Sequence, residues 1–154
     1  QLLQSIMPNN AVIIRTSWVY SEYRNNFVKT MLRLGSEREK LNVIVDQIGT
    51  PTYAGDLADV ILKIISSKNT NFGLYHYSNE GVASWYDFAK TIFEASNLKI
   101  KLNAIKTEAY PTPAKRPFYS VIDKAKIKSI LGIETPNWSE SLLKALKAII
   151  LRNK

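Results

Sequence analysis

The sequence predicts an α/β fold with parallel strands, and three stretches carry this prediction. Residues 11–15 (AVIIR) are a short apolar run closed by a charge, which is typical of a strand buried on both faces of a parallel sheet. Residues 41–65 indicate a strand, a loop and an amphipathic helix. Residues 74–77 indicate another short strand, and a loop leads from it to a helix that begins at Ser84.

The first residues indicate an α/β sheet that has been cut. Residues 1–7 read as the last turns of a helix, which Pro8 and the two asparagines after it break. A helix directly before the strand 11–15 implies a β–α–β crossover whose first strand lies upstream of Gln1. We therefore expect residues 1–154 to be a single truncated domain.

The stretch Asp46–Ile65 (DQIGTPTYAGDLADVILKII) is the centre of the predicted organisation. Thr52 can cap the predicted helix, and Asp56 lies in its first turn, where the helix dipole favours a carboxylate. A strand end that feeds a helix N-terminus through a tight loop is a common place for ligand sites in α/β proteins. An ordinary β–α connection without a ligand remains open on this pattern alone.

The remaining elements follow from hydrophobic periodicity and turn residues. Ser84 and Asp87 form a variant of the capping box, which fixes the start of one helix. The predicted elements are helices over 27–34, 84–96, 124–131 and 139–151, an edge strand over 98–105 and a proline-rich surface loop over 109–117.

Composition narrows the classes of function. The 154 residues, 45% hydrophobic and 22% charged, suit one globular domain. No apolar run reaches the roughly 18 residues of a membrane-spanning helix, so we expect no membrane partner. Because cysteine is absent, disulfides and thiolate metal sites are excluded, and a cytoplasmic location is expected. The net charge of +8 favours an anionic partner, but the lysines lie mostly on helix faces without interleaved aromatic residues, which argues against nucleic acid.

Two local signals have simpler structural interpretations. His76 stands alone on a strand, where a histidine is more often packed and hydrogen-bonded than catalytic. Tyr86 and Lys90 match the Tyr-x-x-x-Lys pair of short-chain dehydrogenases, in which the ammonium lowers the pKa of the phenol. This pair follows the capping residue of a late helix, and no glycine pattern for a dinucleotide precedes it, so we interpret it as a chance match.

Six motifs, in order and at consistent spacing, resemble the C-terminal half of the dTDP-4-dehydrorhamnose reductase family of extended short-chain dehydrogenases/reductases. The motifs are RTSWVY (15–20), NNFVKTM (25–31), DQIGTPTYAGDLA (46–58), YHYSNEG (75–81), SWYDFAK (84–90) and KRPFYSVID (115–123). The resemblance implies the C-terminal portion of a Rossmann-like NAD(P)-binding fold, that is, its last parallel strands with their helices, plus a small substrate-binding lobe.

For the parent protein, the resemblance implies reduction of the 4-keto group of dTDP-4-dehydro-L-rhamnose with NADPH or NADH, in the synthesis of dTDP-rhamnose for polysaccharides. The family carries its glycine-rich loop and its catalytic Tyr-x-x-x-Lys pair upstream of the matched half. The resemblance therefore implies no catalytic residue and no bound cofactor in this chain, and a dTDP-sugar as its ligand.

The resemblance also assigns roles to individual residues. Trp18 matches a tryptophan that packs against the sugar, and Arg116 matches an arginine that approaches the diphosphate, where its fork can grip two oxygens. Asn26 lies at a helix N-terminus suited to a phosphate. The implied substrate-binding residues are Trp18, Asn26, Phe27, Gln47, Thr52 and Arg116.

Two alternatives remain open at this point. One is another nucleotide-sugar epimerase or dehydratase of the same superfamily, and the other is a non-catalytic regulatory subunit like the β-subunit of methionine adenosyltransferase. If 11–15 is an interior strand of an intact sheet, the cut leaves one of its edges open. We therefore expect the isolated chain to self-associate around residues 1–16.

Overall fold

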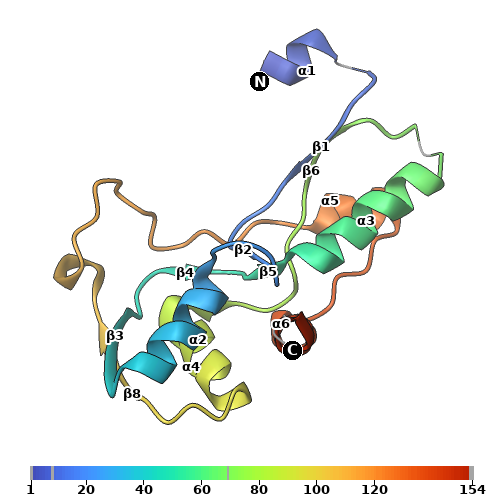
Figure 1. Ribbon diagram of the computed structural model, residues 1–154. Helices are drawn as coiled ribbons and strands as arrows, with labels where there is room; N and C mark the ends of the chain where they lie inside the picture. The colour runs from blue at the N-terminus through green and yellow to red at the C-terminus, as the bar shows by residue number, and fades with distance from the viewer. Residues whose placement is uncertain (1, 8, 69, 153–154) are drawn as a thin grey trace.

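The computed structural model describes residues 2–7, 9–68 and 70–152 as an α/β fold (Figure 1). The expected helix start at Gln1 and its break at Pro8 lie outside these residues. The first helices and strands are α1 (Leu2–Ile6), β1 (Val12–Arg15), β2 (Val19–Tyr20), α2 (Phe27–Glu37), β3 (Lys40–Ile44), β4 (Ile48–Gly49), β5 (Thr52–Tyr53) and α3 (Ala54–Ser66). The rest are β6 (Gly73–His76), β7 (Ala83–Ser84), α4 (Trp85–Ala95), β8 (Lys101–Ile105), the 3-10 turn η1 (Thr107–Ala109), α5 (Ala125–Leu131) and α6 (Trp138–Arg152).

The described strands form pairs rather than one wide sheet. β1 pairs with β6, β2 with β5 and β3 with β8, all parallel, and β4 pairs antiparallel with β7. Parallel pairing of distant strands is what the β–α alternation predicted. The two-residue strands β2, β4, β5 and β7 were not predicted, because a run of two residues has no periodicity to detect.

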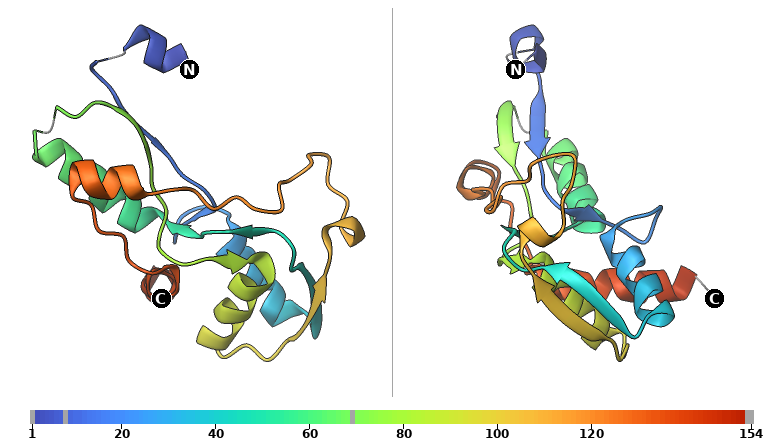
Figure 2. Two further views of the ribbon diagram at one scale, coloured as in Figure 1. Left: turned by 180° about the vertical axis from the view of Figure 1, so that it is seen from behind. Right: turned by 90° about the vertical axis from the view of Figure 1, so that its left-hand side faces the viewer.

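Two separate hydrophobic cores hold these pairs in place. One core packs α2, α4 and α6 around β2 and β5, with Val28, Phe88, Ile92 and Leu142 fully buried. The other packs α3 and α5 against β6, through Val60, Tyr75, Tyr77, Ile127 and Ile133. In Figure 1, α1, β1, β6 and α3 lie on one side of the molecule, and β3 and β8 lie on the other. Figure 2 shows these two sides of the molecule from two further directions.

The strand β1 forms with one paired edge and one open edge, as expected for this chain: Val12, Ile13 and Ile14 are half-buried and Arg15 is exposed, because β6 alone pairs with it among the described strands. The prediction that Thr52 caps the next helix was wrong. Thr52 does not cap α3: the N-cap position is Tyr53, without a side-chain cap bond, and Thr52 lies one residue earlier in β5.

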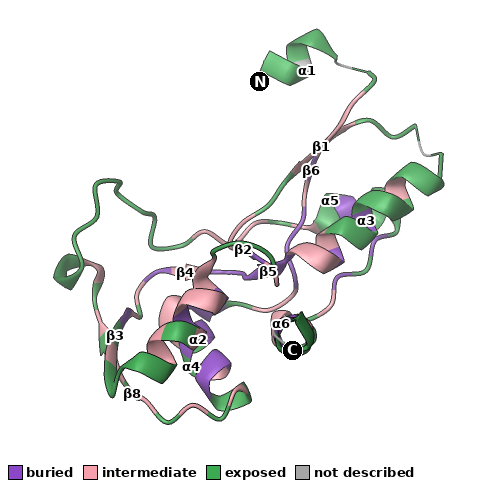
Figure 3. Cartoon of the chain, viewed as in Figure 1, coloured by how far each residue is buried: buried purple, intermediate pink, exposed green. Residues whose placement is uncertain are grey.

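Helix α3 leaves much of its apolar surface uncovered. Val60 is buried, but Ile61, Leu62 and Ile65 are 41%, 60% and 68% exposed. Figure 3 colours the distal half of α3 as exposed or intermediate and the described side chains of α1 as exposed. The described residues therefore do not bury the whole apolar face that the spacing of α3 predicts.

Candidate functional site

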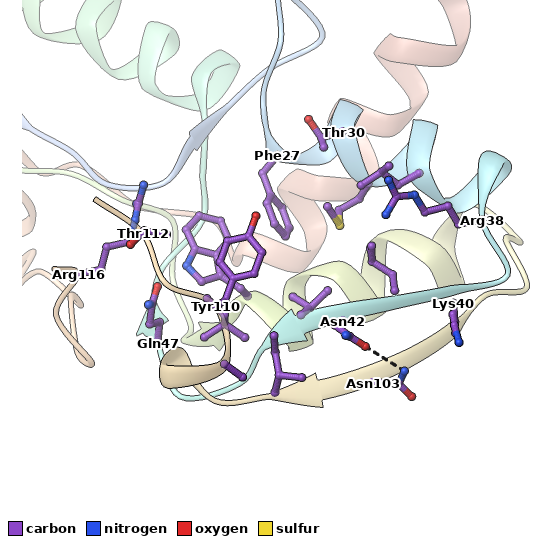
Figure 4. Close-up of a pocket in the computed structure, with 18 of the residues that line it drawn as sticks. Phe27, Thr30, Arg38, Lys40, Asn42, Gln47, Asn103, Tyr110, Thr112 and Arg116 are labelled. Carbon is purple, nitrogen blue, oxygen red and sulfur yellow. Dashed lines mark hydrogen bonds between the residues drawn. The ribbon is translucent and has the colours of Figure 1, made fainter. Parts of the chain in front are cut away.

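A cleft of about 1110 Å³ lies between α2, the pair β3–β8 and the loop that follows η1 (Figure 4). Tyr110, from the loop, and Phe27, from the first turn of α2, point toward each other across it (Figure 4). Gln47 and Arg116 also line the cleft, so three of the predicted site residues meet here. The other principal lining residues are Thr30, Met31, Arg38, Lys40, Leu41, Asn42, Val43, Trp85, Asn103 and Thr112.

The charged side chains that line this cleft are all basic. Arg33, Arg38, Lys40 and Arg116 line it, and no acidic side chain is among the lining residues that the structure describes. Arg33 is paired with Glu37, with 2.6 Å between its Nη1 and the carboxylate. No described acidic side chain forms an ion pair with the other three cations, so their charge is available to an anion.

An aromatic stack forms the wall of the cleft next to the start of α4. The rings of Trp18 and Trp85 are parallel, with centroids 3.6 Å apart and an interplanar angle of 7°. Phe27 packs on Trp85 with a centroid distance of 4.6 Å and on Phe88 at 5.4 Å. Trp85 and Phe27 line the cleft directly, whereas Trp18 is not among the lining residues and reaches it through Trp85. Trp85 was not singled out from the sequence, although it lies in the motif SWYDFAK.

Trp18 is fixed tightly between β1 and β2. Its backbone has a φ of 48°, an unusual value for a bulky residue. The indole lies so close to Gly49 that a Cβ atom there would be 2.5 Å from its Cε2 atom. Because Trp85 covers one face of the indole, a sugar could use only the part of Trp18 that remains open.

The stretch 46–50 connects the parts that surround the cleft. Ile48 donates its backbone N–H to the carbonyl of Phe118 over 2.7 Å and accepts a bond of 2.8 Å from the N–H of Ser120. The hydroxyl of Thr50 donates to the carbonyl of Gly81 over 2.9 Å. The motif that contains Arg116 therefore runs beside β4, and the loop before β7 is attached to the same stretch.

Asp46 and Gln47 hold the beginning of the loop that carries Tyr110 and Arg116. Asp46 accepts hydrogen bonds from the backbone N–H of Thr107, over 2.9 Å, and from its hydroxyl, over 2.8 Å. Gln47 donates from Nε2 to the same hydroxyl oxygen over 3.2 Å. Desolvation acts to raise the pKa of Asp46, but the bonds from Thr107 outweigh it and hold this pKa below its usual value.

Two predicted site residues are engaged in local structure. Asn26 is the N-cap of α2: its Oδ1 accepts from the N–H of Lys29, and its Nδ2 donates to the carbonyl of Ser21 over 2.7 Å. Thr52 is fully buried, and its hydroxyl has no hydrogen-bond partner among the described residues. Neither is among the residues that line the cleft.

A buried polar network lies behind the site and was not predicted. Asn79 is fully buried, accepts from the backbone N–H of Tyr53 over 2.8 Å, and donates to Asp56 over 2.8 Å and to Ser141 over 2.9 Å. The hydroxyl of Ser141 donates to the same carboxylate, and Lys144 lies 3.5 Å from it. The position of Asp56 in the first turn of α3 is confirmed.

Three tyrosines near this network have shifted pKa values. Desolvation, followed by the nearby Asp56 carboxylate, raises the pKa of Tyr20 and of Tyr77 far above the ordinary value. Desolvation and the hydrogen-bonded Glu22 raise the pKa of Tyr53 to about 12. All three phenols are neutral at physiological pH.

The chance-match interpretation of Tyr86 and Lys90 agrees with their surroundings. Tyr86 packs against the hydrophobic core, and Lys90 is exposed, with its ammonium 3.8 Å from the Glu94 carboxylate. His76 is half-buried at the end of β6.

Two glycines of the central stretch have no open space beside them. A Cβ on Gly49 would lie 2.5 Å from the Trp18 ring, and one on Gly55 would lie 2.5 Å from the Tyr53 ring. The space beside these two glycines of the central stretch is therefore filled by rings and does not fit a diphosphate. In the part of the chain that is described, no group of metal-ligating side chains and no helix of membrane-spanning length was found.

Comparison with known proteins identifies the family. The model of the RmlD substrate binding domain matches residues 2–150. This chain belongs to that family. The dTDP-4-dehydrorhamnose reductase of Aggregatibacter actinomycetemcomitans is 47% identical over 152 residues, which cover 92% of this chain and 51% of the relative. The resemblance that the six motifs indicated is thereby confirmed.

Solved structures agree with this membership. A structure of dTDP-4-dehydrorhamnose reductase from Bacillus anthracis in complex with NADP is 43% identical to this chain, with a TM-score of 0.82. The match covers 89% of this chain and 48% of the Bacillus anthracis chain. The predicted Rossmann-like α/β fold class is confirmed by this match. The chain spans about half the length of the relatives that it matches.

A more distant structural neighbour is an epimerase that acts on a nucleotide sugar. The UDP-glucuronic acid 4-epimerase from Bacillus cereus, in complex with UDP-glucuronic acid and NAD, has a TM-score of 0.77 over 99% of this chain but is 18% identical, and the match covers 50% of the epimerase. This likeness shows a shared fold and says nothing about a shared substrate.

Proposed function

We propose that this chain is the nucleotide-sugar-binding half of an NADPH-dependent reductase that converts dTDP-4-dehydro-L-rhamnose to dTDP-L-rhamnose. The observation that carries the proposal is a basic cleft, walled by stacked aromatic rings, in a member of the RmlD substrate binding domain family. The names of its relatives support the substrate and the reaction.

The chemistry of the cleft suits the two ends of such a ligand. Arg116 lies at one end of the cleft and Arg38 and Lys40 lie at the other (Figure 4), so a diphosphate can bind at either end, and a guanidinium can bond two phosphate oxygens at once. Trp85 and Phe27 offer apolar ring surface against which a base or a deoxysugar can pack.

The rest of the active site belongs, in this proposal, to an upstream half of the protein. The NADP in the Bacillus anthracis structure supports NADPH as the cofactor of the whole protein. The uncovered apolar residues of α3 and the open edge of β1 support an upstream half that packs there. The chain alone is then one truncated domain that binds the substrate and does not reduce it.

Isothermal titration of the chain with dTDP-L-rhamnose tests the binding function. Arg116→Ala should weaken binding about tenfold or more, because a charged hydrogen-bond partner of the diphosphate is lost. Trp18→Ala should also weaken binding, since Trp85 loses the ring that stacks on it. Lys90→Ala is the matched control, because it removes an exposed cation outside the cleft. Absence of binding, or equal affinity of the parent and both cleft variants, would refute the assignment.

A turnover assay tests the division of labour between the halves. The chain alone should not oxidise NADPH in the presence of dTDP-4-dehydro-L-rhamnose, because in this proposal the dinucleotide site and the catalytic pair belong to the upstream half. Turnover that Tyr86→Phe abolishes would show that Tyr86 and Lys90 are a catalytic pair, and the proposed division would then be wrong.

We also propose that the isolated chain self-associates through the region around residues 1–16. Among the described strands β1 pairs only with β6, and Leu2, Leu3 and Ile6 are 75%, 49% and 67% exposed. An open strand edge next to bare apolar surface is a template for pairing. Sedimentation velocity at micromolar concentration should show species larger than a monomer, and a clean monomer would contradict this proposal.

A further inference from the structure

The loop of residues 107–118 forms one side of the cleft and is attached to the protein at its two ends. At its beginning, Thr107 bonds to Asp46 through both its backbone N–H and its hydroxyl. At its end, the carbonyl of Phe118 accepts the N–H of Ile48 over 2.7 Å. Both attachment points therefore lie within three consecutive residues of the central stretch, 46–48.

Between these ends, the loop makes few bonds to the rest of the molecule. The bonds found for residues 109–117 in the described structure stay local, such as Tyr110 N–H to the carbonyl of Thr107 over 3.0 Å and the Thr112 hydroxyl to the carbonyl of Ala114 over 2.8 Å. Residues 109–119 are all exposed, and this part of the chain stands off the body of the molecule (Figure 3). Nevertheless, Tyr110, Thr112 and Arg116 all line the cleft (Figure 4).

The bond between Asp46 and Thr107 sets the direction in which the loop leaves the strands. The parallel ladder of β3 and β8 ends with the N–H of Val45 bonding the carbonyl of Ile105 over 2.9 Å. Beyond this point, the Asp46 carboxylate accepts hydrogen bonds from both the backbone N–H and the hydroxyl of Thr107. The Gln47 amide donates to the oxygen of the same hydroxyl over 3.2 Å. The hydroxyl of Thr107 is thus both donor and acceptor, which fixes its rotamer and the turn η1 that follows.

We propose that Asp46 and Thr107 are positioning residues of the nucleotide-sugar site, which hold the loop 107–118 with Tyr110 and Arg116 at the cleft before the ligand arrives. This inference rests on the proposed function. Asp46 is not among the lining residues of the cleft, so it acts on the ligand through the loop. Binding to a loop that is already ordered avoids the cost of ordering it on association.

The predicted effect is on affinity rather than on the fold. Without the bond, the ligand itself has to order two long side chains, which raises the dissociation constant by roughly tenfold. The loop should also open to protease. Lys115 is exposed, and trypsin can cleave after it, whereas the next bond, Arg116–Pro117, resists trypsin.

The test compares four variants of the full chain in three measurements. Asp46→Ala removes the carboxylate, Thr107→Val removes the hydroxyl but keeps the backbone N–H, and Thr107→Ser restores all the donors. Asp123→Ala is the matched control, because its carboxylate also accepts a backbone N–H, from Ala125 over 2.8 Å, at the start of α5 and not at the cleft. The measurements are the rate of tryptic cleavage after Lys115 without ligand, the dissociation constant for dTDP-L-rhamnose, and the midpoint of urea unfolding.

We expect Asp46→Ala and Thr107→Val to speed cleavage after Lys115 and to weaken binding about tenfold, and Thr107→Ser and Asp123→Ala to match the parent. The unfolding midpoint should move equally little in Thr107→Val and Thr107→Ser. Faster cleavage with unchanged affinity would show that the loop does not need to be positioned, and weaker binding with unchanged cleavage would show that Asp46 acts by another route. Either result overturns the inference.

The failure of the proposed function gives a different pattern. If the parent does not bind dTDP-L-rhamnose, the proposed function is wrong, and the inference falls with it. The cleavage rates then still decide whether Asp46 and Thr107 hold the loop. If Asp46→Ala does not fold, Thr107→Val and its serine partner carry the same comparison.

Discussion

Gly49 leaves the space that the Trp18 indole occupies, so Gly49→Ala should disturb the aromatic wall of the cleft. An added Cβ would lie 2.5 Å and 2.7 Å from the Cε2 and Cζ2 atoms of Trp18 and 2.8 Å from the hydroxyl of Ser120. The Trp18 ring is not a flexible end that can turn away cheaply, and turning the Ser120 hydroxyl away would break its hydrogen bond of 3.0 Å to the carbonyl of Ile48. The φ of Gly49 is not in the left-handed region, so the expected effect comes from this collision and not from backbone strain.

The size of the effect follows from the distances. To reach ordinary contact, the Trp18 ring has to move by about 1 Å. It cannot move closer to Trp85, because the two centroids are already 3.6 Å apart, so the stack has to slip. Overpacking of this kind costs about 1–3 kcal/mol of the free energy of unfolding, and the lost aromatic pair adds about 0.5–1.5 kcal/mol.

Gly35→Ala provides a control with a similar collision away from the Trp18–Trp85 stack. There, a Cβ would lie 2.8 Å from the Phe93 ring and 2.9 Å from Leu98. Because Gly35 is inside α2, alanine also gains about 1 kcal/mol of helix propensity, so the net loss should be smaller. Urea unfolding gives the stabilities, and the exciton signal of the Trp18–Trp85 pair in circular dichroism reports the stack.

We expect Gly49→Ala to lose the exciton signal and to weaken binding of dTDP-L-rhamnose, and Gly35→Ala to keep both. If Gly49→Ala keeps the signal and binds as the parent does, then the indole does not need the space beside Gly49. The description of the aromatic wall as a closely packed unit would then be refuted.

Two further predictions concern the residues behind the cleft. Asn79→Ala should lower the free energy of unfolding by about 1–3 kcal/mol, since it leaves the buried N–H of Tyr53 without its partner and removes one of the hydrogen bonds to the Asp56 carboxylate. Asn103→Ala, which removes an exposed amide pair, should cost less than about 0.5 kcal/mol, and equal urea midpoints would contradict this. Desolvation acts to raise the pKa of Glu80, but hydrogen bonds from Lys128 and Thr135 outweigh it, so the folded protein has a lower pKa at Glu80 than the ordinary value of 4.5. The Glu80 carboxylate therefore stabilises the fold at pH values above 4.5. This stabilisation is lost as the pH falls through the lower pKa of the folded state. Glu80→Gln should therefore flatten the loss of stability on acidification, and an acid limb that is as steep as in the parent would disprove the role of Glu80.

The regular elements could be predicted because their signals are local. The capping box of Ser84 and Asp87 is present as predicted, with the Ser84 side chain accepting the N–H of Asp87. Helix α5 ends at Gly132, whose φ of 62° is the left-handed value that glycine adopts most easily. In both cases, residues within one or two turns determine the outcome.

Residues of the candidate site could be proposed from the sequence only where a motif contained them. Trp18 and Arg116 came from the resemblance, but Trp85 and Tyr110 depend on which strands and loops meet in space. Asp46 and Thr107 are 61 positions apart, and their bond exists because β3 and β8 pair in parallel and end together. Thr52 shows the opposite case: its spacing suits an N-cap, but pairing of β5 with β2 takes its backbone, and the helix starts without it.

The buried network around Asn79 explains how two small hydrophobic cores form one molecule. Asp56 belongs to α3, whose Val60 lies in one core, and Ser141 belongs to α6, whose Leu142 lies in the other. Apolar packing alone has little directional preference, so two such cores could sit together at many angles. The fully buried Asn79 amide forms hydrogen bonds with both helices and with the backbone of β5. These bonds restrict the two cores to few of these angles. Since α3 lies on the side of β1 and α6 packs behind the aromatic wall, this network fixes the cleft relative to the face where we propose that the upstream half packs.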